Sequence, residues 1–595
     1  MLATINRCFE LIGSRWRRRW LALLPLTVLT AVLELLAASS VFVLIRVITD
    51  ETGGESIGWL TTARERLGIA AGSATAVAVA IAVAVLFLLK AGLRLSEVYL
   101  RERWVHGSLT DLATRLFGAY LDAPYSFHLR RSSAELLRAI HEGVHSVCGI
   151  VLQSVAITVN EILLAGAVVV VLLFVTPWVS LLVALVIVAL CVAILAGSQR
   201  LASDWGRRLH EASGGKLRLA QQGFASAKEV KLLGRSAFFI DSFRRLRRDE
   251  EVEVAWATFQ WLPRLTMETL FVGGIAVLVV VAHLTSSQPW SLAPTLGMFA
   301  FAAIRLLPSF YLILHHLNRV QLSEASVAAV YDDYRRLGPS AVLPQQPLSA
   351  MTRDIRFESV SFTYEGAARP ALTDIDLIIA AGESIGVVGS TGSGKSTLMY
   401  LLLGLLQPST GRICVDSHDI ESRTSCWQRQ IGYVPQHVYL LDASIAANIA
   451  FGIDDPDVDR LRVIEVARMA QLQDWIESLP AGLDTLVGER GVRVSGGERQ
   501  RIAIARALYR DPGVLVFDEA TAALDNRTEK ELSETIQRLH GRKTLLIVAH
   551  RLTTVRECTR LVFLRDGRIA DIGTYAELLG RNREFQRLAA TLHSS

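Results

Sequence analysis

Two long stretches of the chain, residues 71–90 and 162–196, contain almost no charged side chains. A helix needs about 20 consecutive apolar residues to cross the hydrocarbon core of a bilayer, which is about 30 Å thick. The alternative is a large core helix of a soluble protein, but such a helix rarely runs so far without polar residues. We therefore predict that the first part of the chain spans a membrane as helices.

Apolar segments of this kind recur along the first half of the chain. The polar stretches next to them are basic, and the positive-inside rule places basic flanks in the cytosol. An even number of spans returns both termini there, so we predict a multi-pass protein of the cell (inner) membrane with cytoplasmic N- and C-termini. The six expected spans are about 20–48, 71–98, 147–175, 178–198, 257–284 and 292–319.

The polar segments between spans also have a helical pattern. Residues 100–146 and 199–255 indicate spanning helices that continue into the cytosol, and breaks near 124–133 and 222–235 would turn them back. Outside the membrane, the amphipathic pattern at 57–67 predicts either a helix lying at the membrane interface or a simple loop helix.

The division into domains follows from a change of pattern after the last apolar segment. A chain of 595 residues exceeds the usual size of a single core. We expect a transmembrane domain at 1–325, a proline-containing linker at 326–354, and an α/β domain of short strands and amphipathic helices at 355–590. The net charge of +5 gives no reason to expect nucleic acid, and the six scattered cysteines predict thiols and not disulfides.

A phosphate-binding loop opens the α/β domain. The apolar strand 384–388 leads into a glycine-rich loop and then an apolar helix, which is the context such a loop requires. Backbone amides of the loop would surround phosphate oxygens, Lys395 would reach the terminal phosphates, and the Ser396 hydroxyl would bind Mg²⁺. The expected nucleotide contacts are Gly389, Ser390, Thr391, Gly392, Ser393, Gly394, Lys395, Ser396 and Thr397.

Two carboxylates follow a second buried strand, 514–518. Asp518 stands where a carboxylate would hold Mg²⁺, and Glu519 is positioned to act as general base on the attacking water. An ordinary surface Asp-Glu pair is the alternative, but these residues follow a phosphate loop in the same α/β domain. We therefore assign them to ATP hydrolysis.

With these motifs in order, residues 355–590 resemble an ATP-binding cassette domain. The resemblance implies that Tyr364 stacks on adenine, that Gln436 binds Mg²⁺ and senses the γ-phosphate, and that His550 is the switch histidine. Asp525 matches the loop that contacts the second cassette. It further implies that ATP and Mg²⁺ are the cofactors, with Glu519, His550 and Gln436 in catalysis and Ser396, Gln436 and Asp518 around the metal.

The signature motif of that family reads Val494-Ser495-Gly496-Gly497-Glu498 here, with Val and Glu in place of the usual Leu and Gln. The resemblance implies that Ser495, Gly496, Gly497 and Glu498 contact the ATP held by a second subunit. Because the chain has one cassette, it must pair. An intact set of motifs favours a homodimer, and a heterodimer stays open.

Six spans before one cassette resemble a half-size ABC exporter, which implies ATP-driven alternating access. Local phrases around Glu34, Arg264 and Arg305 resemble the lipid-linked oligosaccharide flippases, although Leu312 stands where a further basic residue is expected. Lys90 and Arg305 would then attract the phosphate or pyrophosphate of the cargo. The alternative for each is an interhelical ion pair or a side chain that snorkels at a membrane interface.

The cargo expected from this resemblance is a lipid-linked oligosaccharide or another polyprenyl or lipid glycoconjugate, and membrane lipids are expected partners. A lipid, lipopeptide or multidrug exporter is the alternative. An ATP-gated channel or a non-transporting ATPase would be a different class, and the intact Glu519 argues against a pure gate.

Overall fold

The computed structural model describes residues 1–49, 73–175, 177–247, 293–338, 351–488, 491–519, 534–549 and 551–593, and scattered residues within 62–66 and 258–280. The chain forms two compact units. The helical unit comprises residues 1–123 and 127–341, and the sheet unit comprises residues 124–126 and 342–595.

Long helices build the helical unit. Three of the helical segments in the described part of the chain are long and apolar enough to cross a membrane: Leu2–Ile48, Ala74–Leu121 and Ser133–Phe174. The described helices are α1 (Leu2–Leu21), α2 (Leu23–Thr49), α4 (Ser73–Leu121), α5 (Tyr125–Arg130), α6 (Ser133–Arg138), η1 (Ala139–Gly143), η2 (Ser146–Leu152), α7 (Gln153–Val175), α8 (Pro177–Ala225), α9 (Ala227–Leu232), α10 (Ser236–Arg247), α13 (Ala293–Leu322) and α14 (Glu324–Leu337).

The expected spans can be placed on these helices. The first falls on α2, the second within α4, the third on η2 and α7, the fourth within α8, and the sixth on α13. Most of the fifth, 257–284, and most of the segment 57–67 lie outside the described residues. Near the predicted breaks, α4 ends at Leu121 and α8 ends at Ala225, and each is followed by a helix of six residues.

The start of the predicted linker is helical. Residues 326–337 belong to α14, whose Val327 and Val330 are fully buried in a cluster with residues of α1, α4 and η2. Burial of these two side chains gives the segment a fixed place in the helical unit. The helical unit therefore extends beyond residue 325, and residues 339–350 lie outside the described part.

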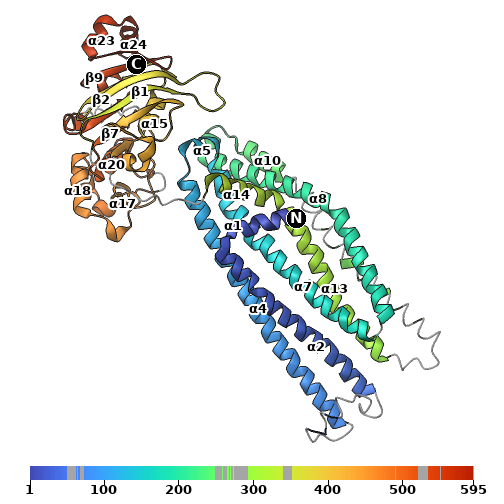
Figure 1. Cartoon of the computed structure of the whole chain (residues 1–595). Coiled ribbons are helices and arrows are strands. Elements are labelled where there is room, and N and C mark those ends of the chain that lie inside the picture. Colours follow the sequence, from blue (N-terminus) through green and yellow to red (C-terminus); the bar gives the residue numbers. More distant parts are fainter. Residues whose placement is uncertain are drawn as a thin grey trace. The chain divides into compact units, whose positions relative to one another are not determined.

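Helices α2, α4, α7 and α13 run alongside one another (Figure 1), and α7 packs against both α2 and α13. Small side chains form part of this contact, since Ala38, Ala165, Ala302 and Ala303 are buried in one cluster. Small residues let helix backbones approach closely in a membrane. The close packing of the four helices brings their polar side chains within reach of one another.

The sheet unit is an α/β domain with two sheets. Its strands are β1 (Asp354–Phe362), β2 (Leu372–Ala380), β3 (Ser384–Val388), β4 (Thr410–Val415), β5 (His418–Asp419), β6 (Ile431–Val434), β7 (Val514–Asp518), β8 (Thr544–Val548), β9 (Arg560–Arg565) and β10 (Arg568–Gly573). The described helices of five residues or more in this unit are α15 (Lys395–Leu402), α16 (Thr424–Gln428), α17 (Ile445–Ile449), α18 (Arg460–Met469), α19 (Gln473–Ser478), α20 (Gly496–Tyr509), α23 (Tyr575–Arg581) and α24 (Arg583–His593).

The larger sheet positions the site. Its strand order is β10-β9-β3-β8-β7-β6, and β9, β3, β8, β7 and β6 are parallel. Strands β3, β7 and β8 are buried throughout, which explains why each is apolar apart from one polar residue at its end. Because the carboxyl ends of parallel strands meet at one edge, the loops after β3, β7 and β6 lie at the same edge of the sheet.

Candidate nucleotide site and charge layers of the helical unit

The phosphate loop runs from β3 to the N-terminus of α15. Gly394 has φ 103°, and a β-carbon there would lie 2.6 Å from a Leu372 methyl group and 2.9 Å from the Ala371 carbonyl oxygen. Only glycine adopts this conformation without strain or collision. The loop can therefore bring its backbone close to a phosphate, as the sequence predicts for such a turn.

Lys395 lies within the curve of this loop. Its ammonium group donates to the carbonyl oxygens of Gly389 at 2.9 Å and Ser390 at 3.0 Å. Burial lowers the pKa of Lys395, and the nearby negative charge of Glu519 opposes that shift. The loop itself thus holds the cation where a phosphate is expected.

The carboxylates predicted for catalysis lie at the same edge. Asp518 ends β7 and accepts a hydrogen bond from the Tyr433 hydroxyl at 3.3 Å, while Gln436 donates to Glu519 at 2.5 Å. The structure thus joins Gln436, two residues after β6, to Glu519, which follows β7. Glu519 has φ 45°, a strained conformation for a non-glycine residue and one that recurs at functional sites.

Burial raises the pKa of Tyr433 well above its usual range, and Asp518 adds to the rise. The tyrosine therefore stays a hydrogen-bond donor to the carboxylate that is expected to bind the metal. The sequence did not single out Tyr433. Its position within β6, one strand from Asp518, is the signal that identifies it.

The remaining loop residues fit a polyphosphate and its metal. Ser393 is buried, and its hydroxyl makes no hydrogen bond within the described part of the chain. Ser390, Thr391 and Ser396 are exposed, so their hydroxyls are accessible to a ligand. With Asp518 and Gln436 nearby on the edge, Ser396 offers an oxygen ligand of the kind that Mg²⁺ prefers.

Tyr364, expected at the adenine, is half-buried, and its hydroxyl lies 3.2 Å from that of Thr397 on α15. Its ring also meets the Phe362 ring edge-on at 4.8 Å. These contacts connect the aromatic side chain to the helix that begins at the phosphate loop. Two other predicted residues, Asp525 and His550, lie outside the described residues.

The signature forms the N-terminus of α20. Ser495 caps this helix, and the Glu498 carboxylate accepts hydrogen bonds from the Ser495 amide and hydroxyl, both at 2.6 Å. This is a capping box, which a glutamate at the third helical position can close. Glu498 therefore has a structural role at the start of α20, one that the usual Gln can also fill, and Val494 packs against the apolar core beside it.

A first polar cluster lies between helices of the helical unit. Glu34 on α2 is 2% exposed and pairs with Lys90 on α4 at 2.9 Å and with Arg305 on α13 at 2.8 Å. We call these three residues the Glu34 layer. The structure thus brings together the two cations predicted to bind cargo, and places one carboxylate between them.

A second cluster lies one helical turn further along the same three helices and adds a residue of α7. Arg94 on α4 contacts Glu97 at 3.0 Å and Glu161 on α7 at 3.1 Å. The Ser309 hydroxyl on α13 donates to Glu161 at 2.7 Å, and the Thr30 hydroxyl on α2 lies 3.4 Å from Glu97. We call these five residues the Glu161 layer.

In the sequence, only the spacing of residues along single helices could have indicated the Glu161 layer. Arg94 follows Lys90 by four residues, and Ser309 follows Arg305 by four, so each pair shares a helix face. Arg94 and Ser309 were not predicted, because nothing in one helix indicates which partner faces it. Only the packing of four helices brings the layer together.

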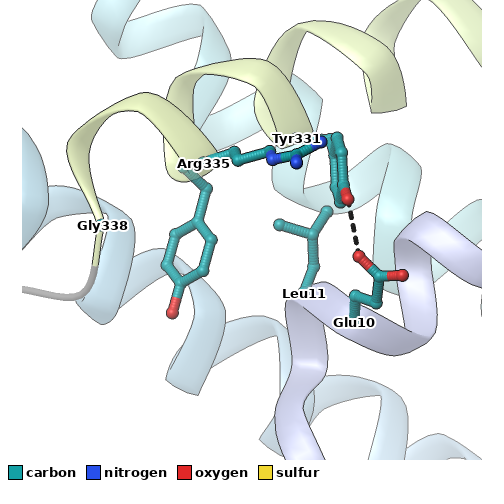
Figure 2. A pocket seen from close by; sticks show the side chains of 6 residues that line it. Glu10, Leu11, Tyr331, Arg335 and Gly338 are labelled. Carbon is teal, nitrogen blue, oxygen red and sulfur yellow. Dashed lines mark hydrogen bonds between the residues drawn. The ribbon is translucent and has the colours of Figure 1, made fainter.

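The helical unit also has a pocket of about 580 Å³ between α1 and α14. Figure 2 shows Tyr331 above Glu10, whose carboxylate accepts a hydrogen bond from the tyrosine hydroxyl at 2.6 Å. Leu11, Tyr334, Arg335 and Gly338 complete the lining. The residues predicted for nucleotide or cargo do not contribute to it.

Comparisons with known proteins agree with this architecture. Residues 20–285 match the family described as ABC transporter transmembrane region, and residues 372–522 match the family described as ABC transporter. A structure described as a bacterial Atm1-family ABC exporter with ATP bound superimposes with a TM-score of 0.77 at 25% identity, covering 97% of this chain and 98% of that one.

Similar sequences include proteins named ATP-dependent lipid A-core flippase. That of Cupriavidus pinatubonensis is 31% identical over 503 residues, which cover 83% of this chain and 84% of the relative. That of Ralstonia nicotianae is 32% identical over 480 residues, covering 80% of each chain.

Proposed function

Because this chain belongs to the ABC transporter family, as a half-size exporter that couples ATP hydrolysis to transport, we propose that it is a homodimeric flippase for a lipid with an anionic head group. The preferred cargo is a lipid-linked oligosaccharide or another glycoconjugate on a phosphate or pyrophosphate. The relatives named lipid A-core flippase support a glycolipid cargo. The anionic head group is inferred from one observation, which is that Lys90 and Arg305 lie together against Glu34.

In the proposed cycle, each ATP lies between the phosphate loop of one copy and the signature of the other. Ser396, Asp518 and Gln436 would hold Mg²⁺, and the metal would supply positive charge to the phosphates. Glu519 orients and deprotonates the attacking water, His550 contacts the terminal phosphate, and Tyr364 supports the adenine. Ser495, Gly496, Gly497 and Glu498 of the second copy close the site, with Asp525 at the contact between cassettes.

Closure on ATP shifts the spans because the two arrangements of the membrane helices differ in affinity for ATP. The protein lies in the inner membrane as a multi-pass protein. We further propose that both termini are cytoplasmic, because Arg15, Arg17, Arg18 and Arg19 directly precede the first span and would stay on the cytosolic side.

A mixing experiment tests the homodimer. One tagged chain carries Lys395→Ala and a second carries Ser495→Arg, and each alone has no intact site in a homodimer. Coexpression gives mixed dimers with one intact site, formed by Lys395 of one chain and Ser495 of the other. Doubly purified mixed dimers should recover ATPase activity, and none would be recovered if each chain completed its own site or required a different partner.

The cargo is tested by stimulation of ATPase activity in nanodiscs. A polyprenyl pyrophosphate should stimulate the wild-type protein, whereas the matched neutral polyprenol should not. Arg305→Gln should remove the stimulation. Equal stimulation by the alcohol and the pyrophosphate would favour the alternative, a general lipid or multidrug exporter.

A further inference from the structure

The two charge layers of the helical unit differ in how their carboxylates are held. In the Glu161 layer, Glu161 accepts hydrogen bonds from Arg94, Asn160 and Ser309 at 2.7–3.1 Å. In the Glu34 layer, Glu34 Oε1 and Arg305 Nε lie 2.8 Å apart, but neither atom makes a hydrogen bond within the described part of the chain. Charge alone therefore holds this contact, without the alignment of a hydrogen bond.

The layers also differ in net charge. Glu34 balances one of its two cations, so the Glu34 layer carries one excess positive charge. The Glu161 layer has two carboxylates and the single cation Arg94, so it carries one excess negative charge. Charges within a membrane are costly when they are not compensated. The two neighbouring layers balance each other overall, but the excess positive charge lies in the Glu34 layer, so an additional anion is attracted to this layer and not to the Glu161 layer.

Exposure gives the direction from which an anion can approach. The Glu34 side chain is 2% exposed, whereas those of Lys90 and Arg305 are 23% and 28% exposed. The carboxylate is thus enclosed, and each cation has a side that remains open. A phosphate group that approached the two cations on those sides would offer more charge and more acceptor oxygens than one carboxylate.

From these observations we propose that Glu34 is the internal counter-ion of the cargo site. It holds Lys90 and Arg305 together when no cargo is present, and it yields them to the phosphate or pyrophosphate of a lipid. Glu34 therefore competes with the cargo and sets how much negative charge a head group must carry to bind. This inference rests on the proposed function, because it assigns the selectivity of the same site.

The test measures binding of farnesyl pyrophosphate, farnesyl monophosphate and farnesol to the full-length protein in nanodiscs of neutral lipid. Removing the competing charge with Glu34→Gln should tighten pyrophosphate binding about tenfold, since a unit charge lies within a few Å of the bound anion. The gain should be smaller for the monophosphate, and farnesol binding should not change. Glu34→Asp keeps the charge and should stay near the wild type.

Glu97→Gln is the matched control, since it removes the same charge one helical turn away, in the Glu161 layer. It should tighten pyrophosphate binding far less than Glu34→Gln does. Thermal unfolding of each variant separates loss of fold from loss of binding. Equal or weaker binding by folded Glu34→Gln overturns the counter-ion role.

The two proposals fail in different ways. If the wild type binds pyrophosphate and Arg305→Gln abolishes binding, the anionic site stands even where Glu34→Gln has no effect. If wild type and Arg305→Gln bind pyrophosphate and farnesol alike, the anionic cargo itself is wrong, and the counter-ion role fails with it.

Discussion

The nucleotide site and the Glu34 layer both gather charge for an anionic ligand, but they do so in different ways. At the sheet edge, Lys395 is held by two backbone carbonyl oxygens, and Asp518 and Glu519 lie at the end of the buried strand β7. In the helical unit, Lys90 and Arg305 share a carboxylate from a third helix. The rigid nucleotide site is expected to accept only phosphate groups. In the Glu34 layer, a ligand has to compete with Glu34 for the two cations.

The greatest loss of activity is expected from a substitution in the nucleotide site. Glu519→Gln should lower ATP turnover by about 100-fold or more, the usual contribution of a general base. The variant should still bind ATP and accumulate as a closed dimer, because the amide keeps the size of the side chain. ATPase assays and size-exclusion chromatography with ATP measure both outcomes, and near-normal turnover would remove Glu519 as the base.

A glycine substitution probes the rigidity of the phosphate loop. Gly394→Ala places a methyl group 2.6 Å from Leu372 at a φ of 103°. It should weaken binding of a fluorescent ATP analogue at least about tenfold, since a few kcal/mol of strain fall on the loop. Gly513→Ala is the control, because a β-carbon there meets nothing within 4 Å. Similar losses from both variants would contradict a loop-specific effect.

In the helical unit, Arg94→Met leaves Glu97 and Glu161 without their shared cation. Leaving buried carboxylates uncompensated should lower the free energy of unfolding by about 3–5 kcal/mol. Arg244→Met removes one partner of an exposed pair with Asp241 and should have little effect. Thermal unfolding in detergent compares the two variants. Equal stability would show that the Glu161 layer does not hold the helices together.

The smallest expected effect concerns the signature. Glu498→Gln keeps an acceptor for Ser495 but removes a negative charge next to the expected γ-phosphate. ATP should bind up to about fivefold more tightly, in the range of a single exposed charge interaction. Titration of ATPase activity against ATP concentration measures the change. Weaker ATP binding would mean that the capping box needs the carboxylate.

How far the sequence predicts the site depends on how local each signal is. The phosphate loop, Asp518 and Glu519 were predictable because a strand, a loop and a helix N-terminus define them within a few residues. The hydrogen bond between Gln436 and Glu519 follows from strand order, which single motifs do not give. The start of the predicted linker is helical, because Val327 and Val330 are buried and the glycine and prolines begin only at Gly338, where α14 ends.

In the membrane half, the sequence identified charges but not their partners. Glu34, Lys90 and Arg305 were visible as costly residues within apolar segments. Lys90 and Arg305 were compatible with an ion pair and with a cargo contact. The choice depends on the packing of α2, α4 and α13, which periodicity within one helix does not determine.

In the proposed function, ATP hydrolysis drives an anionic glycolipid across the membrane. The most direct measurement reconstitutes the wild type and Glu519→Gln in vesicles with a fluorescent polyprenyl-pyrophosphate oligosaccharide and follows its accessibility to a membrane-impermeant quencher. We predict translocation by the wild type only with ATP, and none by Glu519→Gln. Vigorous ATP hydrolysis by the wild type without movement of this lipid would contradict the account.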